Sequence, residues 1–287
     1  MELNPIFYSL MKVIKNRKGK NSVKTEKLKE IYSKYKIDSQ KFGAVGDRLG
    51  DVYEEYCVSI LQDKKLLIQL KKGLQGNKDL EILRGILLSN KITDFNCIDY
   101  IEATTKVPYR ETGGLPKTDI VCTVHYKERQ VILTISCKQS TKPNVALAEF
   151  DVATICKEVG ITDCNLIYLL NKHQTEMSAK NFSDMEKEEL RRLLSPIKEK
   201  FVRWVLTGTT DEFPSDIRFP TTIIRFRIKK NTTWGAIAIV DYDMQDFLIK
   251  NVEEYISLKI SKKGGFGTGL GWTYATGSRG KKIQFKG

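Results

Sequence analysis

The chain has 287 residues, 41% of them apolar, so it is long enough to bury one large hydrophobic core or two modest ones. It carries 48 lysines and arginines against 35 aspartates and glutamates, for a formal net charge of +13. A chain this basic is typical of proteins that bind a polyanion, and nucleic acid is the first expectation. The alternative is a basic surface that only confers solubility.

The cysteines and histidines argue against a disulfide framework and against a zinc site. The six cysteines form no CxxC pair, and several lie inside apolar runs, as reduced core cysteines of cytoplasmic proteins do. The two histidines, His125 and His173, are too few and too far apart for a histidine-based metal cluster. The sequence shows no signal peptide and no apolar stretch of membrane-spanning length, so we expect a cytoplasmic protein that does not contact a membrane.

The first 42 residues predict a basic, helical N-terminal arm. An apolar opening is followed by a lysine-rich passage from Lys12 to Lys36, which either grips phosphates or is a solvated charge run. From Asp47 onward a helix is predicted, because apolar residues recur at helical spacing, namely Leu49, Val52, Tyr53, Tyr56 and Ile60.

Two glutamates, Glu54 and Glu55, flank the apolar stripe of that helix. Either could lean toward a metal ion held at a neighbouring sheet, and either could simply face solvent. Residues 63–90 predict further helix with a break at Gly76-Asn77, and an irregular stretch follows.

Residues 119–138 predict a β-hairpin with chemically active residues at one end. Two apolar runs, 120–124 and 131–135, are joined by a short polar turn. Asp119 precedes the first strand, while Ser136 and Lys138 lie on one face at the end of the second. A carboxylate and an ammonium gathered there could hold a divalent metal and a phosphate, as in a metal-dependent nuclease. A plain cross-strand ion pair is the alternative.

After the hairpin, a helix is predicted from Val145 through Cys156, with Glu149 on its apolar, sheet-facing side. A carboxylate in an apolar stripe needs a partner, either a metal ion or Lys138, unless it only complements the helix dipole. Later elements are predicted from their apolar spacing: a helix and connection over 165–182, a helix over 185–206 bent near Pro196, strands over 221–228 and 233–240, and a helix over 244–260.

The last 26 residues, 262–287, contain no acidic residue and combine glycine, hydroxyl and basic residues with aromatic ones. Such a segment can lie along a DNA duplex, with its basic side chains on phosphates and its polar side chains at base edges. A disordered basic tail is the alternative, but disordered tails are poor in aromatic residues.

Several of these stretches together resemble the MspI family of type II restriction endonucleases, which cut the sequence CCGG. The resemblance runs from about residue 40 to residue 287, and its weakest part is the lysine-rich arm. The matching stretches are DRLG at 47–50, GLPKTD at 114–119, AEFDV at 148–152, TIC at 154–156, KHQ at 172–174, SAK at 178–180, FVRW at 201–204, GFGTGLGWTYATGS at 265–278 and KKIQFKG at 281–287.

The resemblance implies a restriction-endonuclease-like α/β core with a mixed central β-sheet flanked by helices, spanning 43–261, and a DNA-recognition segment over 262–287. The wider superfamily carries the motif PD-(D/E)xK. The resemblance implies that Asp119 binds Mg²⁺ and that Lys138 positions or activates the attacking water. Ser136 stands where most relatives have an acid, so a charge favoured by a hard cation is missing. Some CCGG-cutting nucleases take that acid from the next helix, which makes Glu149 the expected replacement, with Glu54 a further metal candidate.

The resemblance also implies how DNA is recognised. Base contacts are expected from Thr273, Ser278, Gln284 and Lys286, and phosphate contacts from Arg279, Lys281, Lys282 and Lys142. The implied reaction is Mg²⁺-dependent cleavage of double-stranded DNA after the first C of CCGG, leaving a 5′ overhang, in a protein paired with a cognate DNA methyltransferase. Two competing interpretations stay open: a sequence-specific DNA-binding protein with a degenerate, inactive site, and a basic RNA-binding protein.

Overall fold

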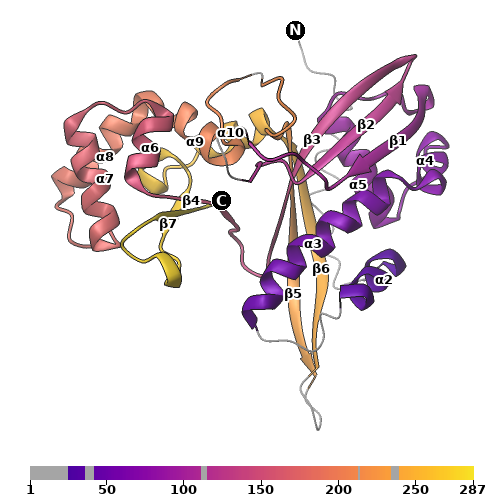
Figure 1. Ribbon diagram of the computed structural model, residues 1–287, viewed down its shortest axis with the longest axis horizontal. Helices are drawn as coiled ribbons and strands as arrows, with labels where there is room; N and C mark the ends of the chain where they lie inside the picture. The colour runs from indigo at the N-terminus through magenta and orange to yellow at the C-terminus, as the bar shows by residue number, and fades with distance from the viewer. Residues whose placement is uncertain (1–24, 36–41, 111–114, 213, 234–238) are drawn as a thin grey trace.

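The structure is a computed structural model that describes residues 25–35, 42–110, 115–212, 214–233 and 239–287. These residues form two lobes, each built on one β-sheet with its own hydrophobic cluster (Figure 1). None of the helices in the described ranges is long and apolar enough to cross a membrane.

The larger sheet contains five strands in the order β1-β2-β3-β5-β6. Their bounds are β1 (Ile98–Thr104), β2 (Ile120–Tyr126), β3 (Arg129–Ser140), β5 (Thr222–Thr233) and β6 (Ile239–Asn251). Strands β3 and β5 are parallel and the other neighbours are antiparallel, which confirms the predicted mixed sheet. The predicted hairpin is β2–β3, closed by Lys127 and Glu128. Both residues have positive φ, the conformation that tight hairpin turns require.

One face of this sheet is covered by helices α2 (Glu26–Tyr35), α3 (Phe42–Leu61), α4 (Lys64–Lys71) and α5 (Lys78–Ser89) (Figure 1). The predicted apolar stripe of α3 is buried in full, and the Tyr53 ring packs 4.7 Å from that of Phe226 on β5. Helix α2 belongs to the predicted N-terminal arm, of which residues 1–24 and 36–41 lie outside the described residues. It buries Leu28, Ile31 and Tyr32 against α3 rather than standing free.

The second lobe contains a three-stranded antiparallel sheet in the order β4-β8-β7. Its strands are β4 (Ala146–Phe150), β7 (Gly271–Thr273) and β8 (Ile283–Lys286). Helices pack on one face: α6 (Val152–Val159), α7 (Cys164–Glu176), α8 (Asp184–Leu194), α9 (Lys198–Thr207) and α10 (Val252–Ile260). The C-terminal segment is therefore a folded part of this lobe. Its Phe285 is fully buried and packs edge-on against Phe201, at 5.3 Å between ring centroids.

Two helix predictions are wrong at their N-terminal halves. Residues 146–150 form strand β4, and α6 begins only at Val152, where the Asp151 side chain accepts a hydrogen bond from Thr154 N at 2.7 Å. Residues 244–251 likewise belong to β6, and α10 begins at Val252. In both places pairing with a distant strand overrides a local helical pattern. The predicted break at Gly76-Asn77 is confirmed, as is the bend near Pro196, which lies in a 3₁₀ turn between α8 and α9.

Candidate active site

The hairpin brings Asp119, Ser136 and Lys138 together, as the sequence predicts. Oxygen Oδ2 of Asp119 accepts three hydrogen bonds, from the backbone N–H of Cys137 at 2.6 Å, from Lys138 Nζ at 2.8 Å and from Ser136 Oγ at 3.1 Å. The backbone N–H of Asp119 donates to Ile135 O at 2.9 Å, so the start of β2 is fixed against the end of β3. The ion pair offered as the alternative is thus present, and it forms part of a larger constellation.

This arrangement leaves one oxygen of Asp119 available. Oδ1 accepts no hydrogen bond from the described part of the chain, while Oδ2 is held by three donors. Ser136 is buried and uses its hydroxyl to orient the carboxylate. Ser136 therefore supplies no negative charge to the site, and a second anionic ligand has to come from elsewhere.

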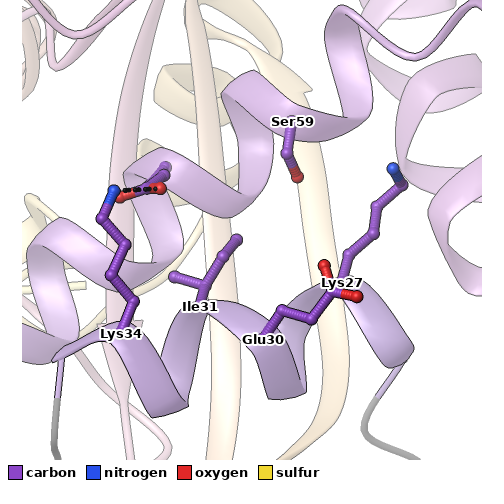
Figure 2. A pocket seen from close by; sticks show the side chains of 6 residues that line it. Lys27, Glu30, Ile31, Lys34 and Ser59 are labelled. Atoms are coloured by element: carbon purple, nitrogen blue, oxygen red, sulfur yellow. Dashed lines mark hydrogen bonds and ion pairs between the residues drawn. The ribbon is translucent and has the colours of Figure 1, made fainter.

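Glu54, on helix α3, is the carboxylate that approaches this site. Its burial, together with the nearby charge of Asp119, raises its pKa to about 7, while Lys138 works in the opposite direction. Two carboxylates whose charges repel each other in this way favour a cation bound near both. Glu55, the next residue, instead pairs with Lys34 of α2 at 2.7 Å. That ion pair lies at a hollow between α2 and α3, which Lys27, Glu30 and Ser59 also line (Figure 2).

The oxygen donors at this site fit Mg²⁺. This ion is usually held by one or two carboxylates and completes its coordination with water and substrate phosphate. Asp119 and Glu54 supply two carboxylates and no soft ligand. Across the residues placed by the structure, no three His, Cys, Asp or Glu side chains gather as a group that could hold a metal.

Glu149 does not join Asp119 and Glu54 in such a group, and the reason for expecting it there does not hold. It lies on strand β4, directly opposite Gln284 of β8, and not on the apolar face of a helix. Its neighbours in sequence, Ala148 and Phe150, pack into the second lobe, so Glu149 points to the opposite face of the small sheet.

Lys117, which belongs to the motif GLPKTD, lies beside the candidate active site, although the sequence pattern did not indicate this position. Its Nζ donates to Leu147 O of β4 at 3.1 Å and lies 5.2 Å from the centre of the Phe150 ring. Burial, with Lys138 and Arg110 nearby, lowers its pKa to about 7. Lys117 thus joins the active-site loop to the small sheet. The sequence signal that could have indicated this position is the place of Lys117 two residues before Asp119.

The small sheet brings three of the predicted base-contacting residues onto one face. On β8, Ile283 and Phe285 are buried while Gln284 and Lys286 are half-buried on the other side. Thr273 lies opposite Gln284, and its Oγ1 lies 3.2 Å from Gln284 Oε1. Ser278 is elsewhere, in a 3₁₀ turn, and its buried Oγ has no hydrogen-bond partner in the described chain. The four predicted phosphate-contacting residues are all exposed: Arg279, Lys281, Lys282 and Lys142.

Known proteins resemble the chain over most of its length. Residues 28–287 match the family described as restriction endonuclease MspI. The type II restriction enzyme MspI of Moraxella sp is 36% identical over 278 residues, which are 92% of this chain and 100% of that protein. The type II restriction enzyme BsuFI of Bacillus subtilis is 25% identical over 245 residues, which are 83% of this chain and 58% of that protein.

The fold agrees with these sequence matches. A crystal structure of MspI in complex with its cognate DNA superimposes with a TM-score of 0.78 at 34% identity, over 92% of this chain and 100% of that one. The family match includes the hairpin with Asp119 and Lys138 and the whole C-terminal sheet. The chain therefore belongs to the MspI family of type II restriction endonucleases.

Proposed function

We propose that this restriction endonuclease hydrolyses one phosphodiester in each strand of double-stranded DNA at CCGG, cutting after the first C and leaving a 5′ overhang. The observation that carries the cleavage step is that three donors hold Asp119 Oδ2, with Glu54 of α3 near enough for its charge to interact with that of Asp119. The 36% identity to MspI supports the choice of sequence.

Asp119 and Glu54 are the residues proposed to hold Mg²⁺, with Asp119 binding through its free oxygen. Mg²⁺ in such a site lowers the pKa of a bound water and stabilises charge on the phosphoryl oxygens. Lys138 donates to Asp119, and we propose that its ammonium contacts the scissile phosphate or the attacking water once DNA is bound. Ser136 and the Cys137 amide keep the carboxylate from rotating.

Recognition is proposed to come from the C-terminal segment. Lys286 donates hydrogen bonds only, which suits the two acceptors of guanine in the major groove, and Gln284, Thr273 and Ser278 supply further polar contacts. Arg279, Lys281, Lys282 and Lys142 neutralise phosphates without selecting sequence. A nuclease with this specificity also cuts its host genome at CCGG, so we propose that it works beside a DNA methyltransferase that modifies the same sites.

Incubation of the protein with a plasmid, first with Mg²⁺ and then with EDTA, tests the proposal. Discrete fragments that end at CCGG and vanish with EDTA are the expected result. A DNA gel shift without cleavage would support a binding protein whose site is inactive, the function that the neutral Ser136 favours. Preferential binding of RNA would contradict both.

A further inference from the structure

Glu149 is an unpaired carboxylate on the face of the small sheet that carries the proposed base contacts. It is half-buried, and it forms no hydrogen bond or ion pair within the part of the chain that the structure describes. Its register partner is Gln284, and directly opposed residues on antiparallel strands have Cβ atoms about 4.5–5.5 Å apart. A basic protein that binds DNA thus exposes a lone negative charge where the duplex is expected.

Phosphates repel such a charge, so a phosphate contact cannot account for its place. A carboxylate accepts hydrogen bonds and donates none. In the major groove, cytosine presents its N4 amino group as a donor, whereas guanine presents only acceptors, N7 and O6. A lone glutamate at a G·C-only site is therefore complementary to cytosine.

The neighbours of Glu149 supply the complementary chemistry for guanine. The Thr273 hydroxyl lies 3.2 Å from both the backbone oxygen and Oε1 of Gln284, and the amide N–H donors of Gln284 have no partner among the described residues. Lys286, two residues on, also donates and forms no ion pair with a described residue. One face of the sheet thus places an acceptor directly beside donors, as the two bases of a G·C pair require.

The face of the small sheet that carries Glu149 lies close to the candidate active site. Lys117 Nζ binds Leu147 O at 3.1 Å, and Leu147 precedes Glu149 by two residues, about 7 Å along a strand. Arg225, the register partner of Lys138, donates to Pro143 O and, at 3.4 Å, to Gly287 O, so the end of the β4–β8 pair at which β4 begins and β8 ends is tied to the central sheet. DNA held at Asp119 therefore passes near Glu149.

We propose that Glu149 is a specificity-determining residue that accepts a hydrogen bond from the N4 amino group of a cytosine in the recognition sequence. The inference rests on the proposed function, and it replaces the expected role of Glu149 as a metal ligand.

The test combines a protein variant with a base analogue. Single-turnover cleavage and binding in EDTA are measured at fixed salt for wild type, Glu149→Ala and Glu149→Gln. The substrates are a CCGG duplex and duplexes in which one cytosine is replaced by 2-pyrimidinone, which lacks the amino group. Glu30→Ala, an exposed glutamate of α2 (Figure 2), is the matched control, and circular dichroism melting verifies folding.

We expect Glu149→Ala to lower cleavage and binding of CCGG by about 10-fold to 100-fold, the range of one good base contact. At one cytosine position, the analogue is expected to lower cleavage and binding by wild type by a similar factor. It is expected to leave cleavage and binding by Glu149→Ala almost unchanged. Glu149→Gln keeps one acceptor and is expected to lie between the two, and Glu30→Ala is expected to match wild type.

Two results would overturn the inference. Equal, additive losses for analogue and variant at every cytosine mean that Glu149 contacts no amino group. A rise in the Mg²⁺ requirement with unchanged binding in EDTA means that it is a metal ligand after all. Failure of the proposed function can be told apart from failure of the inference, because wild type alone would then show no preference for CCGG. That result would also remove the basis of the inference.

Discussion

The pKa of Glu54, raised to about 7, predicts that Mg²⁺ binding at the proposed site depends on pH near neutrality. A metal-binding carboxylate has to be deprotonated, so protons and Mg²⁺ compete for Glu54. Burial and the Asp119 charge both favour the neutral acid, and both effects weaken once a cation sits between the two groups. We therefore expect Mg²⁺ to bind poorly below pH 7 and to reach full affinity above pH 8.

The size of the effect follows from the pKa. Between pH 8 and pH 6 the ionised fraction of Glu54 falls from about nine-tenths to about one-tenth, so the Mg²⁺ concentration for half-maximal cleavage rises about 10-fold, or about 1.4 kcal/mol. At pH 7 Glu54 is about half protonated, and Mg²⁺ binding is expected to release about 0.5 proton.

Mg²⁺ titrations of single-turnover cleavage from pH 6 to pH 8 measure the first quantity, and calorimetry in two buffers of different ionisation enthalpy measures the second. Glu54→Gln is expected to weaken Mg²⁺ binding and to abolish its pH dependence in this range. Glu55→Gln is the control, because Glu55 pairs with Lys34. A half-maximal Mg²⁺ concentration that stays constant with pH in wild type, or that still varies in Glu54→Gln, would refute the assignment.

Three further outcomes are expected. Lys138→Ala should abolish cleavage while binding to CCGG in EDTA, followed by gel shift, stays within a few-fold of wild type. Lys286→Ala should lower discrimination between CCGG and random DNA by about 1–3 kcal/mol; equal weakening on both would identify a phosphate contact. Burial lowers the pKa of His173 to about 4. The contribution of the neutral His173 to the free energy of unfolding is therefore fully present above pH 6.5 and is lost as the pH falls toward 4. Urea unfolding at pH 7.5 and pH 5 should differ by about 2 kcal/mol in wild type and by less in His173→Phe.

The hairpin of the candidate active site could be predicted because the sequence signals that define it are local. Two β-rich runs separated by a short polar turn define the register, and the register alone brings Asp119 to Ser136 and Lys138. Which of Glu54 and Glu55 lies toward Asp119 could not be predicted in the same way. Neighbouring residues on a helix point about 100° apart, and which of them meets the sheet depends on how α3 packs against β3.

The misplacement of Glu149 has a different cause. Residues 145–150 (VALAEF) carry good helix formers, and only pairing with residues more than 130 positions later makes them a strand. The same holds for the aromatic residues of the C-terminal segment. The sequence pattern indicated only that they argue against a disordered tail, whereas Trp272 and Phe285 pack against each other at 5.3 Å in the core of the second lobe. The polar residues that alternate with them lie on the other face of the small sheet, which is the face proposed to contact DNA.

The residues proposed for cleavage and one strand of the sheet proposed for recognition lie on one continuous piece of chain. Strand β3 carries Lys138 and ends at Ser140, and β4 begins only six residues later, at Ala146. Arg225 fixes this short connection at Pro143, and Lys117 fixes β4 from the side of Asp119. Because so few residues separate β3 from β4, we expect a shift of the proposed recognition sheet to be passed to the strand that carries Lys138.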